Sequence, residues 1–374
     1  MRVSDFIAKR LKFLGCSDVY MVTGGAAMHL NDSFGATYGD KVHFLHHEQS
    51  CAMAAESYAR ITGKPAVLNV TAGPGGINAL NGVFGAYVDS LPIIIFSGQA
   101  KRETLVKNSG RPNLRQLGDQ EVDIISMVQK ICKESIIIED PYLIAEELDR
   151  LFISTISDRP GPAWMDVPID IQAFPLPKEF DNLITIPIKE KTKEFIHSKL
   201  LIREEELEKI AKKIIQSTKP VFYVGSGVRI SGAYKQFIAF LEEFPIATVT
   251  GWNSNDLLWD DHPSYSGRPG SVGNRAGNFA VQLADCVITI GCRLNIRQVS
   301  FNWDSFAKNA WKCHIDIDQD ELEKPTLNTD LKIQADILDF FPKLSKKLND
   351  LTKDNKIKGS LSFSSKWKEW RALN

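Results

Sequence analysis

Hydrophobic positions in the first half of the chain alternate between helical spacing and short unbroken runs. Apolar side chains recur at helical spacing between residues 4 and 14, and an apolar run follows at 19–22, which predicts a helix and then a strand. The same alternation predicts strands at 42–45, 66–70 and 92–96 and helices at 50–62 and 76–87. Short apolar strands that alternate with helices indicate a parallel sheet covered on both faces, so we expect a doubly wound α/β domain.

A second round of the same pattern follows a break. The stretch 172–202 contains Pro175, Pro177 and Pro187 and then the charged run KEKTKE, without sustained periodicity, which is typical of an interdomain linker. Beyond it, the pattern predicts a helix at 204–216 and strands at 221–224, 247–249, 286–290 and 313–317. We therefore predict an α/β protein with two doubly wound parallel-sheet domains, at 1–175 and 203–348, joined by a linker at 176–202. The polar tail at 349–374 predicts a further linker.

Composition narrows the class of protein. Hydrophobic residues make up 43% and charged residues 24% of the 374, ordinary values for a folded globular chain. With 45 Lys and Arg against 46 Asp and Glu, no net field would draw the chain to nucleic acid. The six cysteines are scattered in apolar segments, as buried thiols in a reducing compartment are. Neither a signal peptide nor a run of ~18 apolar residues is found, so we expect a cytoplasmic protein that does not bind a membrane.

Glu48 is the first residue with candidate chemistry. The segment FLHHEQSCAMAAESYARITGK places it between a predicted strand and a predicted helix, and Ala52, Ala55 and Ala59 form a stripe that allows close helix packing. A carboxyl group carried into such an interface can donate and accept a proton at physiological pH. A glutamate in the first turn of a helix is also common as a capping or helix-dipole residue, so Glu48 alone leaves both interpretations open.

Other motifs exclude some kinds of site. The TAGPGG turn follows a strand and opens a helix, as phosphate cradles do, but it lacks the GxxxxGK[ST] pattern. His46 and His47 are adjacent on an extended segment and point to opposite faces, so we predict no metal site there. In VGSGVRISG the third glycine, Gly232, comes too late for a dinucleotide fingerprint, which argues against a standard NAD site.

Sequence blocks in a fixed order carry a family resemblance. They are VTGGAAM (22–28), HHEQSCAMAAESYARITGK (46–64), TAGPGGIN (71–78), AYVDSLPIIIFSGQ (86–99) and RPGPAWMDVPIDIQ (159–172). Together they resemble the pyrimidine-binding domain of thiamine-diphosphate enzymes of the acetolactate synthase large-subunit type. The resemblance implies a thiamine-diphosphate pyrimidine-binding domain followed by a Rossmann-like central domain. It implies the N-terminal part of a carboligase or decarboxylase that acts on 2-oxo acids.

The resemblance also assigns roles to single residues. Glu48 matches the carboxylate that hydrogen-bonds N1′ of the aminopyrimidine and thereby activates the cofactor. The other positions that match cofactor contacts are Gly24, Gly25, Gly73, Pro74 and Asn78. Gln99, Gln116 and Lys133 match positions that shape the substrate channel, although the sequence around the last two departs from the family pattern. That departure leaves the substrate open more than the cofactor.

Cofactors and partners follow from the same resemblance. The family binds thiamine diphosphate with Mg²⁺ through a GDG motif, which does not occur in this sequence. We therefore expect the diphosphate and Mg²⁺ site to lie in a domain outside this chain, in a longer protein or a separate chain, and the chain alone to be inactive. In the family, the pyrimidine domain of one subunit faces the diphosphate domain of another, which implies a homodimer or tetramer.

Two questions stay open at this level. Acetolactate synthases bind FAD in the central domain, and IGCRLNIRQ (290–298) and HIDIDQDELEK (314–324) match FAD-contacting regions, yet LNIR replaces the usual FDDR. FAD, ADP or no nucleotide at all are therefore alternatives for the second domain. The chain could also come from another 2-oxo acid decarboxylase of the family, or be a non-catalytic binding or assembly module that retains the fold.

Overall fold

The structure is a computed structural model that describes residues 1–111, 113–188 and 200–352. It divides into two compact units, Met1–Ser198 and Lys199–Asn374, and the division falls inside the stretch 176–202. Part of that stretch, 189–199, lies outside the described residues. Of the predicted tail at 349–374, only residues up to 352 are described, and α16 continues to Leu351.

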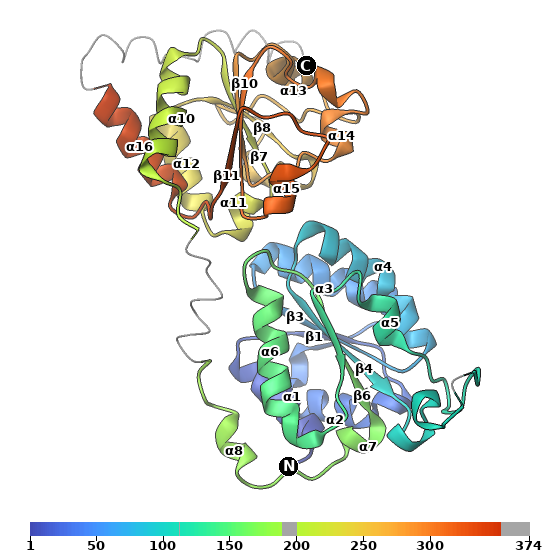
Figure 1. Ribbon diagram of the computed structural model, residues 1–374. Coiled ribbons are helices and arrows are strands. Elements are labelled where there is room, and N and C mark those ends of the chain that lie inside the picture. The colour runs from blue at the N-terminus through green and yellow to red at the C-terminus, as the bar shows by residue number, and fades with distance from the viewer. Residues whose placement is uncertain (112, 189–199, 353–374) are drawn as a thin grey trace. The chain divides into compact units, whose positions relative to one another are not determined.

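Unit 1 is built on a six-stranded, all-parallel sheet in the order β2-β1-β3-β4-β6-β5. Helices cover both faces of this sheet (Figure 1): residues of α1, α2 and α6 share one core, and residues of α3, α4 and α5 share the other. The strands are β1 (Val19–Met21), β2 (Val42–Phe44), β3 (Ala66–Val70), β4 (Ile93–Gln99), β5 (Glu134–Ile137) and β6 (Ala163–Pro168). The α-helices are α1 (Val3–Phe13), α2 (Met28–Tyr38), α3 (Glu48–Thr62), α4 (Pro74–Asp89), α5 (Ile124–Val128), α6 (Ile144–Ile156), α7 (Ile169–Gln172) and α8 (Phe180–Leu183). Short 3-10 turns are η1 (Gly25–Ala27), η2 (Gly39–Lys41), η3 (Arg102–Thr104), η4 (Val106–Asn108) and η5 (Pro141–Leu143).

Unit 2 repeats the architecture with a five-stranded parallel sheet in the order β11-β10-β9-β7-β8. Its strands are β7 (Pro220–Val224), β8 (Ala247–Thr250), β9 (Cys286–Ile290), β10 (Trp311–Asp316) and β11 (Leu331–Gln334). Its helices are α10 (Glu204–Gln216), α11 (Gly227–Ile230), α12 (Tyr234–Glu243), α13 (Arg275–Gln282), α14 (Ile296–Val299), α15 (Gln319–Glu323) and α16 (Phe340–Leu351), with 3-10 turns η6 (Trp252–Leu257) and η7 (Trp303–Ser305). The predicted fold class, two doubly wound parallel-sheet α/β domains, is confirmed.

The strand order places one topological switch point in each sheet. In unit 1 the chain leaves β1 toward β2 on one side, while β3 lies on the other side of β1. In unit 2, β8 and β9 lie on opposite sides of β7. Connections diverge at such a point and leave a crevice at the carboxyl ends of the strands, where open α/β sheets bind ligands. We therefore expect ligand sites at the residues after β1 and β3 and at those after β7 and β9.

The first part of the expected linker packs on unit 1. The guanidinium of Arg10, which is 1% exposed, donates to the carbonyl oxygens of Ile184 at 2.9 Å and Ile186 at 2.5 Å. It also forms a bidentate ion pair with Asp149, at 2.8 and 2.7 Å. A buried charge has to be paired, and here it anchors the chain after α8 to the unit 1 core.

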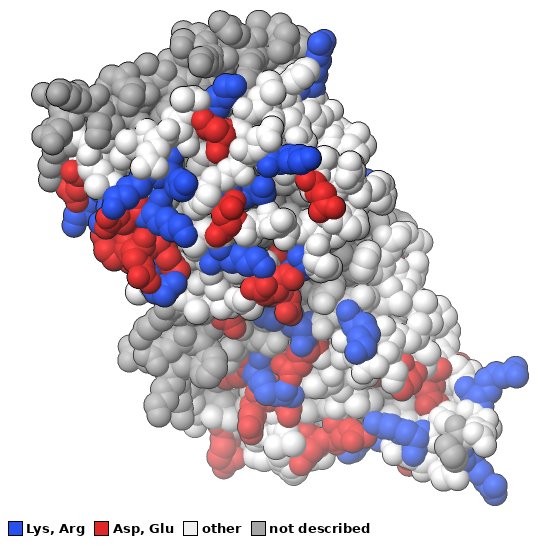
Figure 2. Space-filling model, turned by 45° about the horizontal axis from the view of Figure 1, so that its top comes forward, with Lys and Arg blue, Asp and Glu red and all other residues white. Residues whose placement is uncertain are grey.

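Charges of both signs are mixed over the visible surface. On the face drawn in Figure 2, Lys and Arg side chains are interspersed with Asp and Glu, with no large field of one sign. This distribution agrees with a formal net charge of −1. Over the described residues, the helices are too short or too polar for any of them to cross a membrane.

Candidate functional site

Glu48 begins α3, directly after the extended residue His47 at the carboxyl end of β2. Its carboxylate is half-buried, and its Oε2 accepts a hydrogen bond from Nδ2 of Asn78 on α4 at 2.7 Å. The same amide nitrogen lies 3.3 Å from Nε2 of His47. The structure thus brings together Glu48 and Asn78, two residues that the sequence analysis assigned to one site.

Close contact between α3 and α4 produces this pairing. A Cβ atom at Gly82 would lie only 2.6 Å from the Cβ of Ala52, so α4 can approach α3 this closely only because residue 82 is glycine. Ala52, Ala55 and Ala59 are all buried against this contact. The close packing that the alanine stripe predicts is therefore present, and it carries Asn78 to Glu48.

A threonine at the end of β3 fills the space between two glycines. A Cβ atom at Gly24 would lie 2.4 Å from the Cβ of Thr71, and one at Gly75 would lie 2.8 Å from its Cγ2. The missing Cβ of Gly75 also faces Oε1 of Glu48, at 3.4 Å. Among the described residues, none donates a hydrogen bond to this Oε1, so one oxygen of the carboxylate is held and the other is available to a ligand.

The glycine turn after β1 is fixed on several sides. Gly24 accepts a hydrogen bond on its carbonyl from Nδ2 of Asn31 at 3.2 Å. Nε2 of Gln172 donates to the carbonyl of Ala26 at 2.7 Å, and a Cβ atom at Gly98 would lie 2.2 Å from that carbonyl oxygen. Gly25 itself is exposed, and nothing lies within 4 Å of the place where its Cβ would be. The turn therefore presents open backbone beside Glu48.

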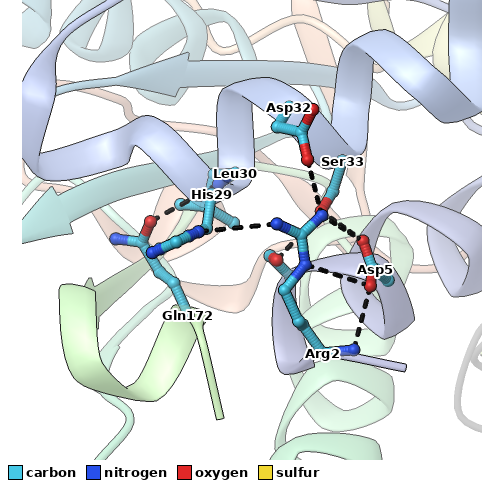
Figure 3. A network of polar contacts seen from close by, with 8 residues as sticks. Arg2, Asp5, His29, Leu30, Asp32, Ser33 and Gln172 are labelled. Atoms are coloured by element: carbon cyan, nitrogen blue, oxygen red, sulfur yellow. Dashed lines mark hydrogen bonds and ion pairs between the residues drawn. The ribbon is translucent and has the colours of Figure 1, made fainter. Parts of the chain in front are cut away.

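A polar network holds α2, the helix that carries Asn31 (Figure 3). Arg2, just before α1, donates to Asp5 at 2.8 Å, to Asp32 at 2.6 Å and to Ser33 at 3.3 Å. From the other side of the view, Oε1 of Gln172 accepts from the backbone of Leu30 at 3.4 Å. These bonds tie α2 to both α1 and α7, so the glycine turn rests on a rigid support.

Gly73 and Pro74 open α4 at the carboxyl end of β3. Gly73 has φ +58°, the left-handed region that favours glycine, and a Cβ atom there would lie 2.2 Å from the carbonyl oxygen of Gln120. Pro74 occupies the first turn of the helix, where its missing N–H is not needed. The start of α4 therefore packs directly against the loop 117–123.

Gln99 and Gln116 both hold that loop. Nε2 of Gln99 donates to the carbonyl of Val122 at 2.9 Å, and Nε2 of Gln116 donates to the carbonyl of Glu121 at 2.9 Å. Gln99 also donates to Oδ2 of Asp166 at 2.9 Å. The two glutamines that the resemblance places in a substrate channel are thus engaged with the backbone of one segment beside Gly73.

Lys133 lies elsewhere. It immediately precedes β5, at the amino edge of the parallel sheet, whereas Glu48, Gly73 and Gln99 all lie at the carboxyl edge. Its Nζ donates to the carbonyl of Ser157 at 2.8 Å, and its side chain packs against Gly161. The structure therefore does not bring Lys133 to the other candidate residues.

Two site residues, Thr71 and Asp166, were not singled out from the sequence. Thr71 opens the TAGPGGIN block, and its two flanking glycine turns were the available signal. Asp166 is a lone acid within the apolar strand β6, and it is 2% exposed. An acid among residues that are all buried needs hydrogen-bond partners, and that was its signal.

The switch point of unit 2 is closed by backbone. A Cβ atom at Gly225 would lie 2.2 Å from the carbonyl oxygen of Gly291, and the N–H of Gly227 donates to that same oxygen at 3.0 Å. Arg293, in the stretch 290–298, forms an ion pair with Glu321 at 2.6 Å. These glycines serve close backbone contact. Throughout the described residues of both units, no group of three or more His, Cys, Asp and Glu side chains could hold a metal ion.

Comparison with known proteins gives the family. Residues 1–127 match the model for the thiamine pyrophosphate enzyme N-terminal TPP binding domain, and residues 207–344 match the model for the thiamine pyrophosphate enzyme central domain. Thiamine pyrophosphate (TPP) is the same compound as thiamine diphosphate. Together the two matches cover more than half of the chain.

The curated relatives described below are acetolactate synthase large subunits. The chain is 31% identical over 334 residues to an acetolactate synthase large subunit of Lactococcus lactis, covering 89% of this chain and 55% of the relative. It is 33% identical over 346 residues to a probable acetolactate synthase large subunit of Methanocaldococcus jannaschii, covering 90% and 54%. To the acetolactate synthase isozyme 2 large subunit of Escherichia coli it is 31% identical over 363 residues, covering 93% and 60%. The chain thus spans little more than half the length of these relatives, and it belongs to the thiamine pyrophosphate enzyme family.

Proposed function

We propose that this chain supplies the pyrimidine side of a thiamine-diphosphate site in an enzyme that decarboxylates or joins 2-oxo acids, as an acetolactate synthase does. One observation carries the proposal. At the switch point of unit 1, Oε2 of Glu48 is held by Asn78 at 2.7 Å, while Oε1 faces the glycine-lined space beside Gly75 and accepts from no described residue. A carboxylate presented in this way can bind a ring nitrogen that carries a proton.

Each residue of the proposed site has its own role. Thiamine diphosphate supplies the carbanion chemistry when it is bound. Glu48 holds or releases a proton at the aminopyrimidine N1′ through Oε1, while Asn78 fixes the direction of the carboxylate through Oε2. Gly24 and Gly75 leave the space in which Thr71 sits, and the open backbone of this turn would line the pyrimidine side of the site. Pro74 and Gly73 fix the start of α4, from which Asn78 projects.

We propose that the diphosphate and Mg²⁺ are held by a further domain, in the same polypeptide or in another chain. Mg²⁺ prefers carboxylate and carbonyl oxygens together with substrate phosphates, and the described residues contain no carboxylate cluster that could hold it. The described residues therefore account for only one side of the proposed site. Calorimetry of this 374-residue chain with thiamine diphosphate and Mg²⁺ tests this division. Micromolar, Mg²⁺-dependent binding by the chain alone would contradict it.

The working enzyme is proposed to be a homodimer or tetramer. Exposed apolar side chains line α3 and α4, the helices that carry Glu48 and Asn78: Met53 (42% exposed), Ile77 (41%), Phe84 (54%) and Tyr87 (41%). Apolar side chains gathered in this way mark surfaces that a partner covers. We expect Phe84→Glu to shift the protein toward smaller species in analytical ultracentrifugation, and Ile61→Glu, at 81% exposure near the far end of α3, to leave assembly unchanged.

The geometry of unit 2 does not favour the binding of FAD. The glycines at its switch point are occupied by each other's backbone, and Arg293 is engaged by Glu321. We therefore propose that unit 2 folds without FAD. The absorbance spectrum of the purified chain tests this: a visible flavin band that survives dialysis would refute it.

The catalytic proposal is tested at Glu48. Glu48→Gln removes the proton that Oε1 exchanges but keeps an amide that can pair with Asn78, so the fold should be retained. In the complete enzyme, with pyruvate as substrate, we expect carbon–carbon bond formation to fall by roughly 100-fold or more, the scale of losing a positioned acid or base. Glu56→Gln is the matched control on the same helix, because Glu56 pairs with Arg60 at 2.7 Å and lies two turns beyond Glu48, beside Gly85 of α4. Undiminished activity of Glu48→Gln would refute the role.

A further inference from the structure

A fully buried carboxylate lies beneath the site and takes no part in the proposed chemistry. Asp166 is in the middle of β6, is 2% exposed, and lies opposite Ser97 of β4 and Ile137 of β5 in the sheet register. Among the described residues, its side-chain partners are Ser97 and Gln99, and no Lys or Arg forms an ion pair with it. An unpaired buried carboxylate costs free energy, so the hydrogen bonds around it need to be explained.

The hydrogen bonds around Asp166 form a chain of donors that ends on its carboxylate. Trp164 donates through Nε1 to Oγ of Ser97 at 2.8 Å, and Ser97 donates to Oδ1 of Asp166 at 2.5 Å. Gln99 donates through Nε2 to Oδ2 of Asp166 at 2.9 Å, and its other Nε2 hydrogen goes to the carbonyl of Val122 at 2.9 Å. Since both carboxylate oxygens accept, this arrangement is the one for ionised Asp166.

The Gln99 carboxamide is consequently locked at three points. Its amide nitrogen is divided between Asp166 and Val122, and its Oε1 accepts from the backbone N–H of Ala100 at 2.9 Å. Val122 belongs to the loop 117–123, and Gln120 in that loop has φ +54° and packs its carbonyl against Gly73 at the start of α4. One side chain therefore links a buried charge to the loop that contacts the site.

We propose that Asp166 is a positioning residue of the site: in its ionised form it orients Gln99, and through Gln99 it fixes the loop 117–123 against Gly73. The importance of this loop for catalysis rests on the proposed function. The positioning itself does not. Protonation of Asp166 removes the charge that strengthens both hydrogen bonds, and a proton on Oδ2 replaces the acceptor of Gln99 by a donor. Gln99 is then held less firmly, and its bond to the Val122 carbonyl fixes the loop less tightly.

Titration of Asp166 falls in an observable range. Burial raises the pKa of Asp166 to about 7, against the opposing effect of the hydrogen bonds from Ser97 and Gln99. Of the other charged groups, Lys107 on η4 lowers it and Asp123 at the start of α5 raises it. The two flanking strands contribute Ser97 and Ile137 at its level, neither of which is charged. A change in the loop near neutral pH can therefore be followed without unfolding the protein.

Amide hydrogen exchange of the 374-residue chain between pH 5.5 and 8.5 tests the proposal. Release of the loop removes the Gln99 donor while Asp166 stays buried, so the pKa of Asp166 is higher with the loop released than with it held. After correction for intrinsic rates, protection of segment 117–124 should therefore rise on the order of 10-fold as the pH increases through Asp166 ionisation, the effect of about one pKa unit of linkage. Asp166→Asn should remove this pH dependence. Asp140→Asn is the matched control, because Asp140 is an exposed residue that caps η5, and it should retain the wild-type profile.

A second variant covers the case in which Asp166→Asn does not fold. Ser97→Ala removes one donor to Asp166 and leaves Gln99 in place, so the midpoint of the loop transition should move to higher pH. A wild-type loop whose protection does not change with pH, or a midpoint that Ser97→Ala leaves unmoved, would overturn the assignment. Because hydrogen exchange needs neither cofactor nor turnover, its outcome is independent of the Glu48→Gln assay.

Discussion

Alanine at Gly82 should destabilise unit 1, whereas the same change at Gly35 should stabilise it. Both glycines lie inside helices of unit 1, Gly82 in α4 and Gly35 in α2. Around Gly35 nothing lies within 4 Å of the new Cβ position, while at Gly82 the new Cβ would lie 2.6 Å from the Cβ of Ala52 and 2.8 Å from the backbone nitrogen of Met53. The two substitutions are chemically identical and differ only in what the methyl group meets.

The magnitudes follow from two opposing effects. Replacing a helical glycine by alanine gains roughly 0.5–1 kcal/mol, because the unfolded chain loses conformational freedom. At Gly82 the new methyl must push α3 away by about 1 Å to reach an ordinary contact distance, and overpacking of this kind costs about 1–3 kcal/mol. We therefore expect Gly35→Ala to stabilise by roughly 0.5–1 kcal/mol and Gly82→Ala to destabilise by about 1 kcal/mol. For a unit of this size the second change lowers Tm by about 2–4 °C.

Differential scanning calorimetry of the two variants beside the wild type measures both shifts. Only the transition of unit 1 should move, since both residues lie there. Gly82→Ala should in addition disturb the bond between Glu48 and Asn78, because α3 carries one partner and α4 the other. If Gly82→Ala stabilises the protein as much as Gly35→Ala does, the close contact between α3 and α4 is not as the structure has it, and the geometry assigned to Glu48 fails with it.

Other predictions test the remaining charges and thiols. Arg10→Met leaves Asp149 and two carbonyl groups without their donor and should lower the free energy of unfolding in urea by about 2–3 kcal/mol. This is below the usual range for a broken buried pair, because Asp149 is 32% exposed and can rehydrate. Lys9→Met, at an exposed position of the same helix, should change stability little. Burial alone would raise the pKa of Glu321, but its contacts with Lys324 and Arg293 lower it to about 2. Its folded pKa is thus below the unfolded one, so its stabilising effect is present above pH ~4.5 and is lost as pH falls toward 2; Glu321→Gln should be less stable than wild type at pH 6, with the gap closing at pH 3. All six cysteines are buried, so iodoacetamide should label the folded chain only at the rate of unfolding, and rapid labelling of any native thiol would contradict this.

The architecture could be predicted because its signals are local. Largely apolar runs gave β3 and β9 at the same bounds that the structure has, and each strand contains only one polar residue, Asn69 in β3 and Thr289 in β9. Helix starts were less accurate. The expected helices at 50–62 and 76–87 begin earlier, at Glu48 and Pro74, so that Glu48 and Asn78 both project from helices. Period alone does not mark a first turn that carries polar residues.

Contacts between distant segments could not be predicted in the same way. Nothing local to residues 176–188 indicates that Arg10 binds the carbonyls of Ile184 and Ile186, because the donor lies far away in the sequence. Lys133 shows the converse. A block-by-block resemblance transfers a role to a position, but the sheet register places Lys133 at the amino edge, opposite Glu48. The assignment of Lys133 stays a prediction that the geometry does not support.

The two units share a topology but differ in the groups at their switch points. Both sheets have a switch point, and in both a glycine after the first of the two strands allows a close approach: Gly24 after β1 and Gly225 after β7. In unit 2, a Cβ atom at Gly225 would lie 2.2 Å from the carbonyl oxygen of Gly291, so backbone meets backbone there. In unit 1, Gly24 is met by the side chain of Thr71, and Glu48 stands beside it with one oxygen held and one available. The same topology therefore gives a backbone contact in unit 2 and a candidate ligand site in unit 1, which differ in the side chain of Thr71 and in the carboxylate of Glu48.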